Sequence, residues 1–287
     1  MTSVVLALVS QSHGQTVVAH RGSSISAPEN TLAAFRLAWE QNADAIEADF
    51  HMTSDEQIVC LHDKTTKRTA PGQTVLSVAT SSLVDLKKLD VGSWKSSDFA
   101  GEPIPTMAEV LNTVPKGKQI FVEIKCGVEV VPHLAKILSA AELEAEQVVI
   151  ICFSKKVVQA IRRKLPQFKC NWLTSYKNDS PEKLWRPTKE QVSETLDKLG
   201  ATGIGSQFNR DVVDQAFVDS IQSQGLGFHV WTVDEPAQIQ SAFEMGVDSV
   251  TTNCPDVAIG IRDGLKSESK TKSKTKSKEP AVSGARK

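Results

Sequence analysis

The sequence predicts an α/β protein that folds as a single (β/α)8 TIM barrel, and three observations lead to this fold class. Strand-like segments alternate with helical segments along most of the chain, which is typical of parallel strands joined by helical crossovers. The chain has 287 residues, of which 40% are hydrophobic and 23% charged, so it can bury one large core. About 250 residues suffice for a barrel of this class as one unit. The strand-like segments are residues 17–21, 45–50, 58–62, 119–125, 147–153, 170–174, 203–208, 227–233 and 247–252.

These nine segments are one more than the barrel needs, and the short spacing between the second and the third explains the excess. Only about seven residues separate them, whereas a crossover between parallel neighbours needs a dozen or more. We therefore expect a β-hairpin that extends the second strand and turns near Ser54 and Asp55. It returns His62 to the rim that holds Asp49, and parallel barrels place active sites at this rim. We interpret the stretch 64–105 as an insertion above the barrel, because Gly, Pro, Ser and Thr punctuate it.

Several expected helices carry recognisable start and stop signals. Asn30 and Thr31 offer a cap before "LAAFRLAWEQ", and Ser154 precedes "KKVVQAIRRKL". Asp234 is expected to cap the helix that begins in "EPAQIQSAFEMG", and Gly246 to end it. These helices are the crossovers that the barrel requires.

Both ends of the chain differ from the predicted barrel domain, which we place at residues 16–264. Residues 1–15 contain a short apolar run but no positively charged start, so they are either a weak or truncated export signal or an ordinary N-terminal segment. They favour an exported protein, periplasmic or secreted, over a cytoplasmic one. Residues 265–287 alternate Lys with Ser or Thr, and we predict a disordered tail there.

Charge and hydropathy exclude some classes of function. Net charge is −1, but residues 266–287 contain eight Lys or Arg and two Glu, a balance of +6 that leaves −7 on the rest of the chain. An acidic body gives no footprint for nucleic-acid binding. The basic tail could attract anionic polymers or membrane surfaces, although a solvated tail without a partner is favoured. No run of 18 or more apolar residues occurs, so no transmembrane segment is predicted.

The five cysteines are scattered and form no Cys-x-x-Cys pair, which favours buried free thiols over a zinc site or a disulfide framework. They are Cys60, Cys126, Cys152, Cys170 and Cys254.

Three carboxylates near strand ends indicate a cation site. Glu47 and Asp49 stand two apart on one strand and therefore point the same way. Burying both costs free energy unless positive charge compensates them, either from Arg or Lys on neighbouring helices or from a metal ion. Glu123 adds a third carboxylate at another strand end, with Lys125 on its face. Hard cations prefer oxygen ligands, so the set predicts a site for Mg²⁺ or Ca²⁺.

Two histidines each close a strand-like run, His20 in "VVAHRG" and His62 in "IVCLHD". Either one alone is more often a structural histidine, but two imidazoles on one rim could act as base and acid across a single bond. Arg21 and Lys125 add positive charge. Carboxylates, a cation, imidazoles and basic side chains together fit chemistry on a phosphate ester. Glycine-rich nucleotide-binding motifs do not occur in the sequence.

The ordered motifs "AHRG", "APENTLAAF", "AIEADFHMTSDEQIVCLHD", "IPTMAEVL", "FVEIK", "WTVDE" and "GVDSVTTNCPD" resemble the glycerophosphodiester phosphodiesterase family. The resemblance covers residues 17 to about 262. It implies a (β/α)8 barrel that hydrolyses glycerophosphodiesters to sn-glycerol 3-phosphate and an alcohol with the help of a divalent cation. It also implies roles for individual residues: metal ligands Glu47, Asp49 and Glu123; an acid/base pair His20 and His62; phosphate contacts Arg21 and Lys125; and an aromatic pocket wall, Trp231. A core position is the alternative for Trp231. We expect Phe208, at another strand end, to wall the same pocket.

The mechanism stays open in part. We expect His20 to assist the attack and His62 to protonate the leaving alcohol, and the nucleophile is either water or the neighbouring glycerol hydroxyl. One alternative is a lipid-directed phosphodiesterase of the phospholipase D or sphingomyelinase D kind on the same barrel. A second is a non-catalytic phosphate-binding module. Head group, choice of cation and oligomeric state are left open by the sequence.

Overall fold

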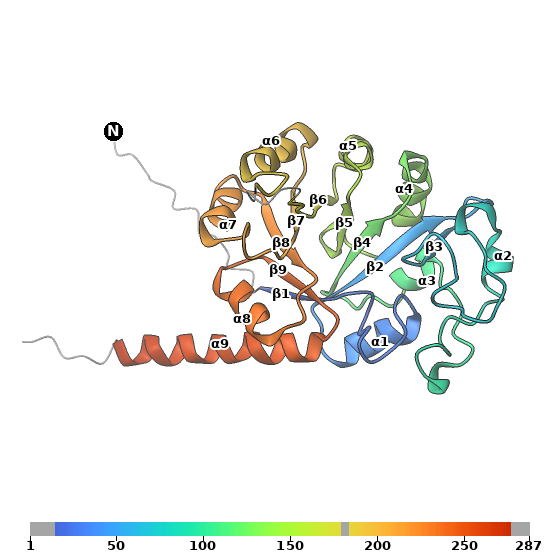
Figure 1. The fold of residues 1–287 in the computed structure, drawn as a ribbon, viewed down its shortest axis with the longest axis horizontal. Coiled ribbons are helices and arrows are strands. Elements are labelled where there is room, and N and C mark those ends of the chain that lie inside the picture. The colour runs from blue at the N-terminus through green and yellow to red at the C-terminus, as the bar shows by residue number, and fades with distance from the viewer. Residues whose placement is uncertain (1–14, 179–183, 277–287) are drawn as a thin grey trace, which may run out of the picture.

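Eight parallel strands close into a barrel in the computed structural model, which describes residues 15–178 and 184–276 (Figure 1). β1 pairs with β2 on one side and with β9 on the other, and these pairings complete the ring. The predicted TIM barrel is therefore confirmed. Its strands are β1 (Thr16–Ala19), β2 (Ala45–Met52), β4 (Gln119–Ile124), β5 (Val148–Cys152), β6 (Lys169–Thr174), β7 (Gly203–Gln207), β8 (Gly227–Trp231) and β9 (Ser249–Thr252).

The ninth strand, β3 (Ile58–Cys60), forms the predicted hairpin with β2. The two strands pair antiparallel, with Phe50 opposite Cys60. Leu61 then donates its backbone N–H to the carbonyl oxygen of Asp49 at 3.0 Å. The hairpin thus carries the chain back beside Asp49, as the sequence predicted.

Helices surround the barrel on its outer side (Figure 1). Thr31 and Ser154 cap the starts of α1 and α5 as predicted, because their side chains accept hydrogen bonds from Ala34 N and Val157 N. The prediction for Asp234 is wrong: Glu235 precedes α8 without a side-chain cap, and Asp234 bonds elsewhere. The helices are α1 (Leu32–Glu40), α2 (Leu83–Leu86), α3 (Met107–Leu111), α4 (Val131–Ala140), α5 (Lys155–Lys164), α6 (Lys189–Leu199), α7 (Gln215–Gln222), α8 (Pro236–Glu244) and α9 (Pro255–Lys276).

Alternation along the strands divides the side chains between two environments. Outward residues such as Ile46 and Val122 pack with the helices in the main hydrophobic core. Inward residues such as Ala45 and Phe121 form a separate cluster inside the barrel. The period of two continues along β2 and β4, so Glu47 and the other acidic residues of these strands also point inward. The strand register therefore gathers carboxylates at one end of the barrel interior.

The insertion at 64–105 has a small core of its own beside β3, as an insertion above the barrel requires. It contains α2 and two short 3-10 helices, η1 (Val78–Thr80) and η2 (Ser97–Phe99). Figure 1 shows this segment at one end of the molecule, next to β3. Its core joins β3 to the insertion through Val59, Leu61, Ala70, Val78, Leu86, Leu89, Val91 and Ile104.

The two termini differ in how far the structure describes them. α9 continues to Lys276, so residues 265–276 are helical where a disordered tail was expected. Lysine favours helix, and the packed first half of α9 supplies the nucleus that this extension needs. Residues 1–14 and 277–287 lie outside the described residues, and so do the predicted leader and the last part of the tail.

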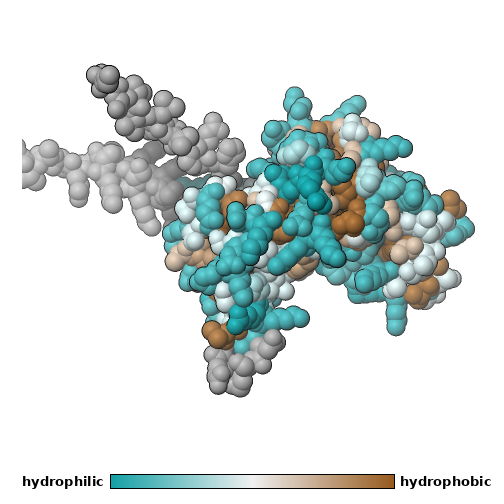
Figure 2. Space-filling model, turned by 90° about the horizontal axis from the view of Figure 1, so that it is seen from above, coloured by the Kyte–Doolittle hydropathy of each residue, from teal (hydrophilic) through white to brown (hydrophobic). Residues whose placement is uncertain are grey.

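The hydropathy of the helices and the state of the cysteines can be compared with the sequence predictions for the described residues. Within residues 15–178 and 184–276, no helix combines the length and hydropathy needed to cross a bilayer. Figure 2 shows one face on which hydrophilic residues predominate and hydrophobic residues gather in small patches. All five cysteines are free, and four of them are buried. Buried free thiols were the expectation.

Candidate active site

A tight turn after β1 aims the first two site residues. Arg21 and Gly22 both adopt left-handed backbone conformations, with φ of 57° and 81°. A side chain on Gly22 would meet the backbone of Ala34 at 2.6 Å, so only glycine fits this close approach to α1. The turn directs the backbone N–H of Arg21 to Glu47 Oε2 at 3.0 Å and places Arg21 Nε 3.2 Å from Asp49 Oδ2.

Three buried carboxylates meet at this end of the barrel. One oxygen each from Glu47, Asp49 and Glu123 lies within 4.8 Å of the others. Lys125 Nζ stands 2.8 Å from Glu123 Oε1 and 3.4 Å from Asp49 Oδ1. Asn30 donates from Nδ2 to Asp49 Oδ2 at 2.8 Å. The second oxygen of Glu47, Oε1, is buried without any hydrogen-bond partner.

The cluster holds more negative charge than its neighbours neutralise. Burial, together with Asp49 and Glu123, raises the pKa of Glu47 well above its ordinary value. Burial and Asp49 likewise raise the pKa of Glu123 to about 7. Burial would also raise the pKa of Asp49, but Lys125 and Arg21 outweigh it and the pKa is lowered. An all-oxygen, over-acidic cluster with a buried, unpartnered oxygen is the donor set that a hard divalent cation requires, so these residues fit a metal ion.

His62 is held by a carboxylate. Its Nδ1 lies 2.7 Å from Asp63 Oδ1. Its carbonyl oxygen lies 3.1 Å from His51 Nε2, which must donate because a carbonyl only accepts. Asp63 in turn binds Arg68, and this contact, with His62, lowers the pKa of Asp63 to about 2. His62 therefore lines the cavity with an imidazole whose Nδ1 has an anionic partner.

His20 is held differently, by an amide. Asn253 donates from Nδ2 to Asp234 Oδ2 at 2.6 Å, which turns its oxygen toward His20 Nδ1 at 2.8 Å. Nδ1 therefore carries the hydrogen, and Nε2, 4.0 Å from Glu47 Oε2, keeps its lone pair. Burial and the charge of Arg21 lower the pKa of His20, so its neutral form is favoured.

A cavity of about 180 Å³ joins these groups. Its polar and charged side comes from β1 to β4 and the residues that follow them, and its other side is apolar. Trp231 Nε1 donates to the carbonyl oxygen of Gly205 at 2.8 Å, and the ring of Phe153 meets the Trp231 ring edge-on, with centroids 5.5 Å apart. The lining residues are His20, Arg21, Glu47, His62, Glu123, Lys125, Ile151, Phe153, Leu173, Trp231, Thr232 and Thr251.

Comparison with known proteins agrees with this geometry. A family model described as the glycerophosphoryl diester phosphodiesterase family matches residues 20–257. This chain belongs to that family. As a member it is an enzyme, a phosphoric diester hydrolase.

Relatives and solved structures support the assignment over most of the chain. A glycerophosphodiester phosphodiesterase of Caldanaerobacter subterraneus subsp. tengcongensis is 31% identical over 249 residues, which cover 85% of this chain and 96% of the relative. One from Bacillus subtilis is 28% identical and covers 86% of both chains. A phosphodiesterase of Oleispira antarctica, solved with the product sn-glycerol-3-phosphate, shares the fold with a TM-score of 0.76, 24% identity and coverage of 86% of this chain and 96% of that one.

Eight of the nine predicted site residues of this family member come together. Asp49 lies just behind the cavity, paired with Lys125. Phe208 does not line the cavity; its ring lies beside Arg210, whose guanidinium carbon is 5.4 Å from the ring centroid. The inward positions of β7 are Gly203, Gly205 and Gln207, because side chains at the two glycines would meet Asn171 and Leu173 inside the barrel. Phe208 falls on the other face.

Other contributors were missed by the sequence reasoning. Phe153 replaces Phe208 as the second aromatic wall, and its spacing of two from Ile151 was the available signal. Asn253 and Asp234 orient His20, and Asn30 holds Asp49. These polar contacts join residues far apart in sequence, so no local pattern shows them.

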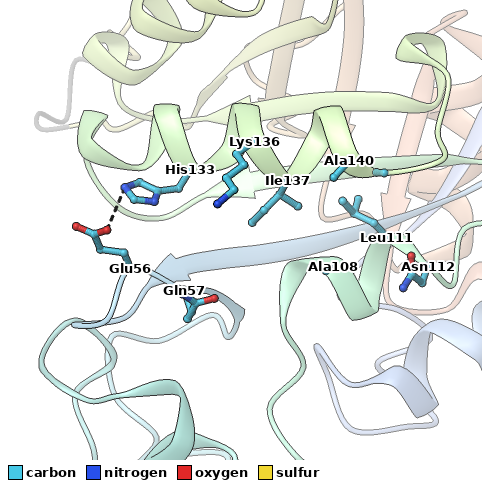
Figure 3. Close-up of a pocket in the computed structure, with 10 residues that line it drawn as sticks. Glu56, Gln57, Ala108, Leu111, Asn112, His133, Lys136, Ile137 and Ala140 are labelled. Atoms are coloured by element: carbon cyan, nitrogen blue, oxygen red, sulfur yellow. Dashed lines mark ion pairs between the residues drawn. The ribbon is translucent and has the colours of Figure 1, made fainter.

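A larger hollow of about 410 Å³ lies outside the barrel (Figure 3). It runs between α3, α4 and the tip of the β2–β3 hairpin, and we call it the outer groove. In Figure 3 the side chains of His133, Lys136 and Ile137 extend from α4 across from Leu111 on α3. Its one drawn ion pair joins His133 Nε2 to Glu56 Oε2 at 3.9 Å.

Proposed function

We propose that this enzyme hydrolyses glycerophosphodiesters to sn-glycerol 3-phosphate and an alcohol, with a divalent cation, Mg²⁺ or Ca²⁺, in the carboxylate cluster. The observation that carries the proposal is that two histidines, two basic side chains and a cluster of three buried carboxylates meet at one cavity, with Asp49 just behind its wall. The sn-glycerol-3-phosphate bound to the Oleispira antarctica neighbour supports this product.

Glu47, Asp49 and Glu123 would hold the cation. When bound, it would polarise the phosphoryl oxygens and offset the charge that develops on them. The chain's own cations are arranged for the same task, since Arg21 and Lys125 line the cavity beside the cluster. Preorganised positive groups at a phosphate stabilise the transition state without reorganisation.

The histidines divide the proton transfers. We assign the general base to His20, because its Nε2 carries a lone pair fixed by Asn253. It takes the proton of the attacking hydroxyl, which belongs either to water or to the glycerol. Attack by the glycerol hydroxyl would form a cyclic phosphate, which water then opens to give sn-glycerol 3-phosphate. We assign the general acid to His62, whose Nδ1 faces the carboxylate of Asp63. It gives a proton to the oxygen of the leaving alcohol.

A second candidate, a lipid-directed phosphodiesterase, is favoured by one observation: Ile151, Phe153, Leu173 and Trp231 make one side of the cavity apolar. Phe153 is also 44% exposed at the rim. A polar head group uses little of such a wall, whereas an alkyl chain would bury against it.

One assay tests both candidates. Metal-stripped protein is given glycerophosphocholine, lysophosphatidylcholine or sphingomyelin, with Mg²⁺, Ca²⁺ or Mn²⁺, and the products are identified. We expect sn-glycerol 3-phosphate and choline in equal amounts from glycerophosphocholine, only with an added cation. Preferential cleavage of the two lipids would favour the second candidate. Binding of substrate without turnover under all conditions would leave a phosphate-binding module.

We also propose, from residues 1–15 alone, that the protein is exported. N-terminal sequencing of the mature protein should then begin at Gln15, and an intact Met1 in the isolated protein would contradict export.

A further inference from the structure

A row of charged side chains outside the cavity joins Arg21 to His62, and Arg68 stands at its centre. The Arg68 guanidinium donates to Glu29 at 2.7 and 2.8 Å and to Asp63 at 2.9 and 3.1 Å. Glu29 also accepts from Arg21 Nη1 at 2.9 Å, and Asp63 lies 2.7 Å from His62 Nδ1. The guanidinium of Arg68 therefore forms paired hydrogen bonds with two carboxylates. Each carboxylate also contacts a residue that lines the cavity: Glu29 contacts Arg21, and Asp63 contacts His62.

The backbone around Arg68 is fixed. The turn that carries it is closed by Ala70, whose N–H donates to the carbonyl oxygen of Thr66 at 2.9 Å. Leu76 N–H donates to Thr66 Oγ1 at 3.0 Å, and both Thr66 and Thr69 are buried. Arg68 thus projects from an anchored turn at the start of the insertion toward the β1–α1 loop.

This arrangement differs from an ordinary surface ion pair. A single exposed pair contributes little, because solvent screens it and two flexible side chains must be ordered. Here Arg68 contacts each carboxylate in a bidentate manner, which the planar guanidinium of arginine allows and the ammonium of lysine does not. The contacts also end on two groups, His62 and Arg21, that line the cavity, although Arg68 does not line it.

We propose that Arg68 is a positioning residue for the phosphodiester reaction, holding Asp63 against His62 and Glu29 against Arg21. The proposal rests on the proposed function, because it assigns Arg68 to the acid and to a phosphate-binding cation of that site. Asp63 is one-third exposed, so its carboxylate is free to turn away from His62 once Arg68 is removed. Loss of Arg68 should therefore misalign proton donation and weaken the hold on Arg21 together.

Two substrates with the same glycerol phosphate and different leaving groups separate these effects. Choline leaves as an alkoxide unless it is protonated, whereas p-nitrophenolate leaves without a proton. For Arg68→Gln we expect kcat on glycerophosphocholine to fall about tenfold or more and kcat on the p-nitrophenyl diester to fall less than about threefold. KM should rise on both substrates, because Arg21 serves the phosphate that they share.

Two further variants complete the test. Lys67→Gln removes the same charge from the exposed neighbouring residue and should leave both substrates unaffected. Arg68→Lys keeps the charge but cannot form paired hydrogen bonds to both carboxylates, so it should restore KM more than kcat on glycerophosphocholine. Thermal melts of all three report folding, and if Arg68→Gln does not fold, Arg68→Lys carries the comparison alone.

Several results would overturn the proposal. Equal loss of kcat on both substrates would indicate a general structural role. Full recovery of kcat and KM by Arg68→Lys would show that the charge of Arg68 matters and its paired hydrogen bonds do not. An active parent with an Arg68→Gln variant equal to Lys67→Gln would refute the positioning role and leave the proposed function standing. A parent inert on both substrates would overturn both.

Discussion

The cavity at the barrel mouth and the outer groove differ in volume and in the charged groups that they bury. The groove is the larger, at about 410 Å³ against about 180 Å³. Yet only the cavity holds buried groups in conflict: Glu47 keeps an unpartnered oxygen, and its pKa and that of Glu123 are raised by burial and by like charge. The groove's ionic groups are partly exposed. Unsatisfied buried charge, rather than volume, marks the functional hollow.

The histidines of the two hollows repeat the contrast. His20 and His62 each have a partner at 2.7 to 2.8 Å that fixes the ring, and both line the cavity. Among the residues that the structure describes, His133 in the groove pairs with Glu56 at 3.9 Å, and Glu56 is 69% exposed. The contrast can be tested by changes that should act strongly in the cavity and weakly in the groove.

The largest effect is expected from the cavity histidines. His20→Ala and His62→Ala should each lower kcat about 10²- to 10⁴-fold, because each removes one proton transfer. Steady-state kinetics on glycerophosphocholine measures the loss, with His133→Ala as the matched control. A double His20→Ala, His62→Ala variant as active as the parent would refute the assignment of both residues.

The barrel interior beneath the cavity should respond to acid. Burial lowers the pKa of His229 to about 4, and its Nδ1 pairs with Ser249 Oγ at 2.8 Å. Below pH 6.5, the ordinary pKa of histidine, His229 binds a proton in the unfolded chain but stays neutral in the folded chain. The fold therefore keeps its full stability above pH 6.5 and loses part of it as the pH falls toward about 4. The loss should approach about 3 kcal/mol.

Chemical denaturation across this range measures the free energy of unfolding. His229→Gln should flatten the acid side of the profile, because glutamine does not titrate. An unchanged profile in the variant would show that other groups carry the acid sensitivity.

A smaller effect is expected on the stability of the metal-free protein. Glu47→Gln removes a buried carboxylate that burial and its neighbours disfavour, so the free energy of unfolding should rise by roughly 1–3 kcal/mol. Because the raised pKa means that stability is lost as the carboxyl ionises, the advantage of glutamine should grow with pH. Thermal melts should show an increase of about 2–4 °C for each kcal/mol. A lower melting temperature would mean that the carboxylate stabilises the fold.

The smallest effect belongs to the outer groove. Lys136→Ala and His133→Ala should change the free energy of unfolding by no more than about 0.5 kcal/mol, as surface substitutions do. They should leave kcat/KM within about twofold of the parent. A strong loss of activity in either variant would give the groove a role that its loose ion pair does not indicate.

Much of this contrast could be predicted from the sequence, because it depends on short-range patterns. The period of two placed Glu47 and Asp49 on one face, and the short gap before β3 predicted the hairpin that returns His62. The same period also distinguishes Phe153, which is inward, from Phe208, which is not. The period of two therefore favours Phe153 as the second aromatic wall, and the expectation for Phe208 is wrong.

Contacts between distant segments could not be predicted. Asp234 stands where a helix cap is expected, but Asn253, 19 residues farther on, takes its carboxylate. Arg68 reaches Glu29 across 39 residues. Such partners depend on how the rim loops fold over one another, and one sequence carries no local signal for them.

The measurement that tests the central claim most directly is a titration of metal-stripped protein with the cation. Calorimetry measures cation binding, and the release of sn-glycerol 3-phosphate from glycerophosphocholine measures activity at each cation concentration. The carboxylate cluster predicts that activity is absent without cation and rises in parallel with cation binding, and that Glu47→Gln loses both while remaining folded. Full activity after complete removal of metal, or cation binding by Glu47→Gln equal to that of the parent, would contradict the assignment of this cluster as the catalytic metal site.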